Sequence, residues 1–129
     1  MIYLDSCILI YLLEAQPYIR RGIAEALRQA PPETLCFSPL CKLECLVFPR
    51  RNSDAELLRH YEQVFASLKE LPISSAIFDE ACQLRAVHNL KTPDALHLAT
   101  AEHHGCTDFW TNDTRLSKIN SQIAFRILP

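Results

Sequence analysis

The sequence predicts an α/β protein with a central parallel sheet of four to five strands sandwiched between helices. Short apolar segments of strand length alternate along the chain with longer segments whose apolar residues recur at helical spacing. The strand-like segments are apolar along most of their length, as expected for parallel strands that are buried on both faces. Strands that alternate with helices also favour crossover connections, which join parallel strands.

The first part of the chain predicts two strands and two helices. Residues 1–5 form a short buried strand, and Ser6 is expected to cap a helix that continues to about Glu14. Pro17 can open a second helix, which the prolines of "APPE" end. The segment "TLCF" then predicts the second strand.

Two helices and a third strand follow in the middle of the chain. Ser38 and the proline after it start a helix that is expected to end at Pro49. Residues 53–68 predict an amphipathic helix, which a capping box of Ser53 and Glu56 would open. The segment "ELPI" is then the third strand.

The last part of the chain completes the sheet. Ser74 is expected to cap a helix to about His88, and Thr92 to start another helix that Gly105 ends. The segment "DFWT" predicts a fourth strand and "AFRIL" a fifth. Because no linker interrupts the chain, we expect a single domain over residues 1–129.

The composition is typical of a globular cytoplasmic protein. The net charge is −2 with a pI near 6.2, which argues against a general nucleic-acid coating protein but not against an enzyme whose acidic site is neutralised by metal. The longest apolar run, residues 7–13, is far shorter than the ~20 residues that cross a bilayer, so no membrane association is expected. Six cysteines without a C-x-x-C pair or a secretory signal favour reduced thiols.

Acidic residues lie where α/β proteins form their sites, beyond the carboxyl ends of the strands. Asp5 closes the first predicted strand and Asp113 closes the fourth. Asp94 lies in the first turn of the last helix, and Glu44 lies in the helix after the second strand. Asp108 begins the fourth strand and is therefore expected at the opposite edge of the sheet.

Each aspartate of this set also has a purely structural interpretation. Asp94 could stabilise its helix through the helix dipole, a contribution of ~0.3–1 kcal/mol. Asp5 could cap the first helix, and Asp113 could be a turn residue in "TNDT". For each residue taken alone, the sequence leaves both interpretations open.

Glu44 is harder to explain as a structural residue. Its neighbours one helical turn away are all apolar, namely Leu40, Cys41, Val47 and Phe48. Glu44 is therefore expected in the middle of the core-facing stripe of its helix. A carboxylate in that position is costly unless it is paired or lies close to a metal.

His97 shares a helix face with Asp94. It could orient the carboxylates, but a half-buried helix histidine is the favoured interpretation. Four carboxylates that converge on one edge repel one another, and a hard divalent cation such as Mg²⁺ stabilises a cluster of this kind. Such a metal suits phosphoryl transfer, because it orients and deprotonates a water and neutralises charge on phosphate oxygens.

Four segments of the chain together resemble a known family. They are "MIYLDSCILIYLLE", "SPLCKLECL", "TPDALHLATAEHHGC" and "FWTND", in this order. The set resembles the PIN-domain ribonucleases, most closely the VapC-type toxins of bacterial type II toxin–antitoxin systems. The resemblance spans essentially the whole chain, and "PDALHLATA" and "TND" are its most specific parts.

The resemblance implies a PIN fold and Mg²⁺- or Mn²⁺-dependent hydrolysis of single-stranded or looped RNA. The acidic quartet of the family maps onto Asp5, Glu44, Asp94 and Asp113. By the resemblance, the three aspartates hold the metal directly or through water. Glu44 lies more than one turn into its predicted helix, so a water-bridged role suits it better.

The resemblance also implies supporting residues around the quartet. Ser6 and Thr111 match the small hydroxyl positions beside the first and last aspartates. Asn112 belongs to the "TND" element and would hold the loop or contact phosphate. Candidate cations that face the RNA are Lys42, Arg50, Arg51, Lys91, Arg115 and Lys118.

The implied partners are the RNA substrate, a small cognate antitoxin and a second copy of the chain in a homodimer. An antitoxin of this kind wraps around the first helices and can place a basic side chain among the carboxylates. The sequence does not separate a toxin from a stand-alone PIN nuclease, and a catalytically inactive PIN-like RNA-binding protein is a further alternative.

Other classes with an acidic cluster fit the sequence less well. A response-regulator receiver needs a phospho-accepting aspartate at the end of its third strand, and "ELPIS" has none. Phosphatases with a nucleophilic aspartate after the first strand usually show D-x-D, whereas Cys7 stands at the second position after Asp5. An inactive protein would have no reason to keep Glu44 among apolar neighbours.

Overall fold

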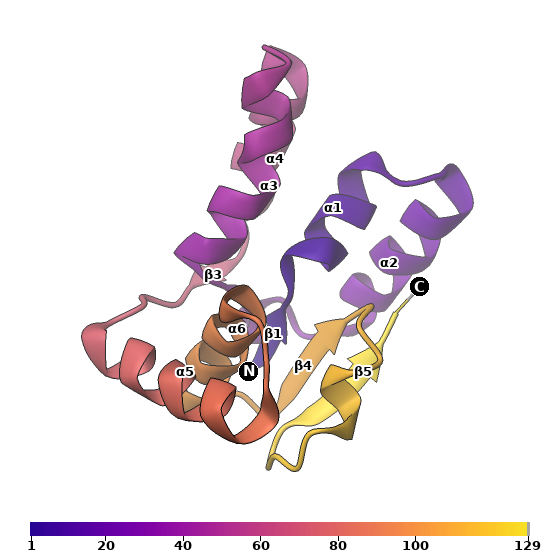
Figure 1. Cartoon of the computed structure of the whole chain (residues 1–129). Coiled ribbons are helices and arrows are strands. Elements are labelled where there is room, and N and C mark those ends of the chain that lie inside the picture. Colours follow the sequence, from indigo (N-terminus) through magenta and orange to yellow (C-terminus); the bar gives the residue numbers. More distant parts are fainter. Residues whose placement is uncertain (129) are drawn as a thin grey trace.

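The computed structural model describes residues 1–128 as alternating strands and helices (Figure 1). The strands are β1 (Ile2–Leu4), β2 (Leu35–Phe37), β3 (Lys69–Glu70), β4 (Asp108–Thr111) and β5 (Ala124–Ile127). The α-helices are α1 (Ser6–Glu14), α2 (Pro17–Gln29), α3 (Pro39–Arg51), α4 (Ala55–Ala66), α5 (Ser75–His88) and α6 (Thr92–His103). Two 3₁₀ helices are η1 (Pro32–Thr34) and η2 (Leu116–Lys118). Pro129, the last residue of the predicted domain, lies outside the described residues.

The strands form one parallel five-stranded sheet in the order β3-β2-β1-β4-β5. The predicted α/β class with a parallel sheet is therefore confirmed, including its fifth strand. β1 lies at the centre, where Tyr3 pairs with Cys36 of β2 on one side and with Phe109 of β4 on the other.

Helices cover both faces of this sheet. The chain moves from β1 outward to β2 and β3, and then crosses back to β4 and β5. Because crossovers between parallel strands are right-handed, this reversal places α1 to α4 on one face and α5 and α6 on the other. Within the layers, α1 packs against α2 and α3, and α5 packs against α6, while α3 and α6 also contact each other. Figure 1 shows that the hairpin of α3 and α4 projects beyond the sheet.

The central strands and α1 carry the main core. Tyr3, Leu4, Ile8, Phe37 and Phe109 are at most 1% exposed. Tyr3 also stacks on Phe109, with the ring centroids 5.2 Å apart. Full burial of an apolar side chain of this size contributes about 1.5–3 kcal/mol, so the end of β1 is rigidly anchored.

The third strand is shorter than predicted and begins one residue earlier. β3 covers only Lys69–Glu70, whereas "ELPI" predicted residues 70–73. Pro72 has no backbone N–H to offer the ladder, so regular pairing cannot continue through it. Leu71 still donates its N–H to the carbonyl of Phe37 at 2.8 Å, which extends the pairing by one residue.

The third helix continues beyond Pro49, where the sequence predicted its end. α3 continues to Arg51 with Pro49 buried inside it. Because Pro49 lies in the last turn, its missing N–H removes a hydrogen bond only near the end of the helix. Its carbonyl accepts the N–H of Asp54 at 2.9 Å, and this bond closes the turn that leads into α4.

The fourth helix is capped by Asp54, so the predicted capping box of Ser53 and Glu56 is wrong. The side chain of Asp54 accepts the N–H of Leu57 at 3.1 Å. Ser53 has a φ of 49°, a left-handed conformation that does not suit the N-cap position.

Among the helices of residues 1–128, none is both long and apolar enough to cross a membrane.

Replacing Asp54 tests this cap. Asp54→Ala removes the acceptor for the N–H of Leu57, and we expect the free energy of unfolding to fall by about 0.5–2 kcal/mol. Urea denaturation followed by circular dichroism measures the change. Ser53→Ala is the matched control and should change the free energy by less than about 0.5 kcal/mol. An equal loss in both variants would contradict the assignment.

Candidate metal centre

The candidate site lies at the carboxyl edge of the sheet, between β1 and β4. Asp5 directly follows β1, and Asp113 lies just beyond the end of β4. From these two neighbouring strands the chain leaves in opposite directions, toward β2 and toward β5. In open parallel sheets, such a reversal leaves a crevice beyond the strand ends where ligands bind.

Asp5 is held in one orientation by hydrogen bonds to both of its carboxylate oxygens. Oδ1 accepts the backbone N–H of Ser6 at 2.8 Å, and Oδ2 accepts the hydroxyl of Thr111 at 2.8 Å. The first bond makes Asp5 the N-cap of α1, so the prediction that Ser6 caps this helix is wrong. The hydroxyl of Ser6 lies 3.5 Å from the same Oδ1. Asp5 can therefore cap the helix and still face the site.

Asp5, Glu44 and His97 form a compact cluster. Nε2 of His97 lies 2.5 Å from Oε1 of Glu44 and 3.6 Å from Oδ1 of Asp5. One ligand atom from each residue lies within 4.8 Å of the other two. The cluster thus joins three segments, namely the end of β1, α3 and α6.

His97 is more buried and more constrained than predicted. It is only 2% exposed, so the interpretation as a half-buried histidine is wrong. Its Nδ1 lies 2.7 Å from the hydroxyl of Tyr3, which lies 2.8 Å from Oγ of Ser38. Because both ring nitrogens have protein partners, His97 is placed to orient Glu44 rather than to bind a metal itself.

Glu44 owes its position to His97 rather than to a buried helix face. Of the neighbours that predicted a core-facing stripe, Cys41 is buried, whereas Val47 and Phe48 are 43% and 56% exposed. Both residues belong to α3, which forms with α4 the hairpin that projects beyond the sheet (Figure 1). Burial raises the pKa of Glu44, but the hydrogen bond and charge of His97 outweigh burial and bring the pKa below its ordinary value. Glu44 is therefore a stabilised carboxylate.

Asp94 shares its electrostatic environment with the other aspartates. Burial raises the pKa of Asp94 above its ordinary value, and the negative charges of Asp113 and Asp5 raise it further. Arg115 and His97 oppose this rise in pKa. A neighbouring like charge disfavours the ionised form of a carboxyl, so the shift in Asp94 reflects the crowding of carboxylates at this edge.

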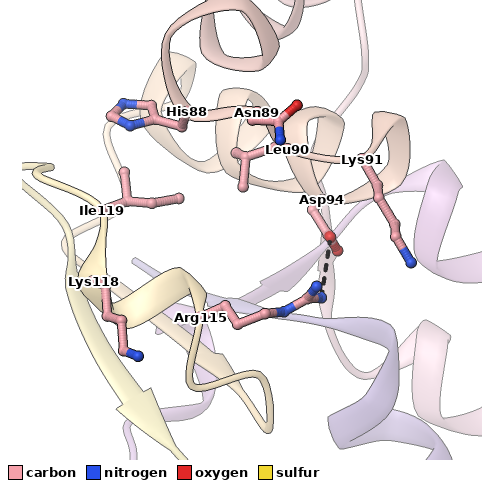
Figure 2. A pocket seen from close by; sticks show the side chains of 8 residues that line it. All are labelled: His88, Asn89, Leu90, Lys91, Asp94, Arg115, Lys118 and Ile119. Carbon is pink, nitrogen blue, oxygen red and sulfur yellow. Dashed lines mark ion pairs between the residues drawn. The ribbon is translucent and has the colours of Figure 1, made fainter.

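Arg115 contacts the carboxylates of Asp113 and Asp94. Its Nε and Nη2 donate to the two oxygens of Asp113 at 3.0 and 2.7 Å. Nη2 also lies 3.8 Å from Oδ2 of Asp94, the ion pair drawn in Figure 2. The hydrogen bonds from Arg115 hold the pKa of Asp113 below its ordinary value. Arg115 therefore supplies part of the positive charge that the cluster needs.

The "TND" element is tied to the first helix. The side-chain amide of Asn112 donates to the hydroxyl of Tyr11 at 2.6 Å, and its backbone N–H donates to Sγ of Cys7 at 3.4 Å. The hydroxyl oxygen of Thr111 accepts the N–H of Asp113 at 3.1 Å. These contacts hold the loop after β4 in place and leave the phosphate role of Asn112 a prediction.

Sequence reasoning missed Tyr3, Ser38 and Tyr11 as parts of the site. The two tyrosines stand in apolar runs and resemble ordinary core residues. The one available signal was chemical, because a buried tyrosine hydroxyl needs a hydrogen-bond partner.

Three of the predicted RNA-facing cations line a cavity of about 510 Å³ beside the carboxylates (Figure 2). They are Lys91, Arg115 and Lys118, and Asp94 lines the same cavity.

The other three predicted cations lie elsewhere. Arg50 and Arg51 lie in the last turn of α3, at the outer end of the projecting hairpin, and do not line this cavity. Lys42 pairs with Glu70 at 3.0 Å. An RNA-binding role for Arg50 and Arg51 stays a prediction.

The donor set at this edge fits a hard divalent cation. Carboxylate oxygens are the ligands that Mg²⁺ and Mn²⁺ prefer, and Asp5, Glu44, Asp94 and Asp113 supply them from four segments. The repulsion that raises the pKa of Asp94 is the interaction that a cation would relieve.

The proton on His97 makes stability depend on pH. Burial alone would lower the pKa of His97, but its contacts with Cys41 and Glu44 and the charge of Asp5 raise the pKa above its ordinary value. Above about pH 6.5, the folded protein therefore keeps a proton that the unfolded chain has lost. The resulting stability is fully present below that pH and falls by about 1.4 kcal/mol per pH unit as the pH rises toward the folded-state pKa.

We expect the free energy of unfolding of the wild type to exceed that of His97→Gln by more at about pH 6 than at about pH 8.5. Urea denaturation in chelator at both pH values measures the difference. A difference that stays constant, or grows at high pH, would show that His97 does not carry the raised pKa.

The chain is similar to known proteins along almost its whole length. The family model of the PIN domain matches residues 2–121. No curated protein sequence gives a significant match.

Solved structures share the fold at low sequence identity. A toxin–antitoxin complex from Klebsiella pneumoniae has a TM-score of 0.80 at 24% identity, with 96% of each chain covered. VapBC2 from Rickettsia felis, bound to a DNA fragment from its promoter, has a TM-score of 0.79 at 17% identity over 100% of each chain. VapC20 from Mycobacterium tuberculosis, described as a sarcin-ricin loop cleaving toxin, has a TM-score of 0.74 at 15% identity, covering 96% of this chain and 99% of that one.

The family match includes the segments that carry the whole carboxylate cluster, from Asp5 to Asp113. The parallel sheet and its helices agree with the solved relatives over nearly the full chain. The chain therefore belongs to the PIN domain family.

Proposed function

We propose that this PIN-domain protein is a metal-dependent endoribonuclease and the toxin of a toxin–antitoxin pair. One observation carries the proposal. Carboxylates from four separate segments, Asp5, Glu44, Asp94 and Asp113, gather at the open edge between β1 and β4. An acidic cluster of this kind, open to a polymeric substrate, suits metal-assisted hydrolysis of a phosphodiester.

Asp5, Asp94 and Asp113 would hold Mg²⁺ or Mn²⁺, directly or through water. The contact with His97 occupies Oε1 of Glu44, which leaves its second carboxylate oxygen to accept a hydrogen bond from a water. We propose that Glu44 acts through a bridging water. When bound, the metal would lower the pKa of a water and offset charge on the phosphate oxygens.

The remaining tasks fall to side chains that position these carboxylates. Thr111 and the N–H of Ser6 fix both oxygens of Asp5. His97, itself in contact with Tyr3, orients Glu44. The guanidinium of Arg115, which now pairs with Asp113, has the donor geometry that also suits a phosphate.

The toxin role rests on the structural relatives and on exposed apolar side chains of two helices of this chain. The relatives include a toxin–antitoxin complex and a toxin described as cleaving the sarcin-ricin loop. On α2 and α3, Tyr18, Leu43, Val47 and Phe48 are 43 to 68% exposed. Large exposed apolar side chains mark protein interaction sites, and we propose that a small antitoxin covers these. A homodimer stays a prediction, which analytical ultracentrifugation checks.

Loss of a single carboxylate tests the nuclease activity. Asp94→Asn keeps the shape of the side chain but removes its charge, and we expect RNA cleavage in Mn²⁺ to fall by about 100-fold or more. The assay maps cleavage ends in total RNA with purified protein, with and without excess chelator.

Asp108→Asn is the matched control. Asp108 begins β4 at the opposite edge of the sheet, so this variant should cleave RNA like the wild type. Cleavage that persists in Asp94→Asn or in chelator would contradict the proposal, as would an equal loss in Asp108→Asn.

Arg115 competes with a metal for the same carboxylates. We expect Arg115→Ala to bind Mn²⁺ about two- to fivefold more tightly than the wild type, because an exposed ion pair is weak but must be displaced. Isothermal titration calorimetry measures the affinity. Lys118→Ala removes the same charge from a residue with no ion pair among residues 1–128, and should change affinity less. Weaker binding in Arg115→Ala would show that Arg115 supports the metal.

A further inference from the structure

The cavity beside Asp94 is large and continuous with the carboxylate cluster. Its volume is about 510 Å³, within the range of about 300–1,000 Å³ that is usual for small-molecule sites. It is formed between the connection from α5 to α6 and the segment of η2 that follows β4 (Figure 2). Asp94 and Arg115 form its shared wall with the proposed active site.

One part of the cavity is apolar. Leu90 and Ile119 point toward each other across it in Figure 2. Both are half-buried and pack against the main core, so these walls are backed by structure. The carbonyl of Leu90 also accepts Nε–H of Arg85 at 2.9 Å, which fixes the connection between the helices. Such walls can contact the flat face of a nucleobase.

The rim of the cavity is polar and positive. Lys91 and Lys118 lie on opposite sides of it in Figure 2, and neither forms an ion pair with any residue from 1 to 128. The charge of Lys91 contributes to the lowered pKa of Asp113, so it acts close to the carboxylates. The side chains of His88 and Asn89 also line the cavity, and within the described part of the chain neither makes a hydrogen bond.

We propose that this cavity binds one unstacked nucleotide of the RNA, next to the phosphate that lies at the carboxylates. This inference rests on the proposed nuclease function. The apolar walls take the base, His88 and Asn89 offer hydrogen bonds to its polar edge, and Lys91 and Lys118 face the flanking phosphates. Bases that are free of a duplex can be splayed into protein pockets in this way, so the cavity selects single-stranded or looped RNA.

The test first measures nucleotide binding in chelator, so that no metal at the carboxylates is needed. The probes are the four ribonucleoside 5′-monophosphates and ribose 5-phosphate, followed through the methyl NMR signals of Leu90 and Ile119. We expect at least one nucleotide to shift both signals and to bind at least about fivefold more tightly than ribose 5-phosphate. Equal binding of ribose 5-phosphate, or unshifted methyl signals, would overturn the proposal.

Two pairs of variants locate the binding. Ile119→Trp fills the cavity and should weaken nucleotide binding about tenfold or more, whereas Asn120→Trp, at an exposed neighbouring position, should not. Lys118→Glu reverses an exposed charge without touching the core and should also weaken binding. The control is Lys69→Glu. Lys69 lies on β3, the edge strand far from the cavity, so this variant should bind nucleotides like the wild type. Equal effects within both pairs would overturn the proposal.

The second measurement uses a short RNA with a mapped cleavage site. An abasic nucleotide placed beside the cleaved bond should lower kcat/KM of the wild type at least about fivefold, because the apolar contacts of the base with Leu90 and Ile119 are lost. The same abasic substitution should have little further effect in Ile119→Trp. If an abasic nucleotide leaves kcat/KM unchanged at every position, the proposed nucleotide subsite is wrong, while the proposed nuclease function stands. Nucleotide binding without any RNA cleavage would instead overturn the nuclease function.

Discussion

Repulsion between Asp94 and the carboxylates of Asp5 and Asp113 is the constraint on which the site and its surroundings depend. Burial raises the pKa of Asp94, and the negative charges of Asp113 and Asp5 raise it further. Two cationic side chains neutralise part of the negative charge of the cluster. Arg115 pairs with Asp113, and His97 pairs with Glu44. The protein thus holds negative charge together at a cost in stability. Such a destabilising cluster at an open sheet edge is explained if it binds a cation and, through the cation, a phosphate.

The fold supplies the rigidity that such a cluster needs. β1 is the central strand, its side chains Tyr3 and Leu4 are fully buried, and Asp5 follows directly. Parallel pairing with β4 brings Thr111 within hydrogen-bond distance of that carboxylate. Tyr3 also reaches His97, so the central strand positions two of the site's groups at once. Stability and site geometry therefore depend on the same strand.

The sequence predicted the parallel α/β fold and the location of four carboxylates near the strand ends, because apolar runs, helical spacing and strand ends are local patterns. The role of these carboxylates as metal ligands stays a prediction. It could not reveal the contacts of His97 with Tyr3 and Glu44, which join segments 94 and 53 residues apart. The caps at Ser6 and Ser53 were misplaced by one residue, because serine and aspartate cap helices about equally well. Exposure of Val47 and Phe48 depends on the projecting hairpin and on no pattern within α3.

The central claim is that the carboxylates at this edge form one metal site. Crystals grown with Mn²⁺ and measured near the manganese absorption edge test it most directly, because the anomalous signal locates the ion without reference to activity. We predict an anomalous peak between the carboxylates of Asp5, Asp94 and Asp113, with Arg115 turned away from Asp113. No peak at this edge in the presence of Mn²⁺, or a peak only at another part of the surface, would contradict the account.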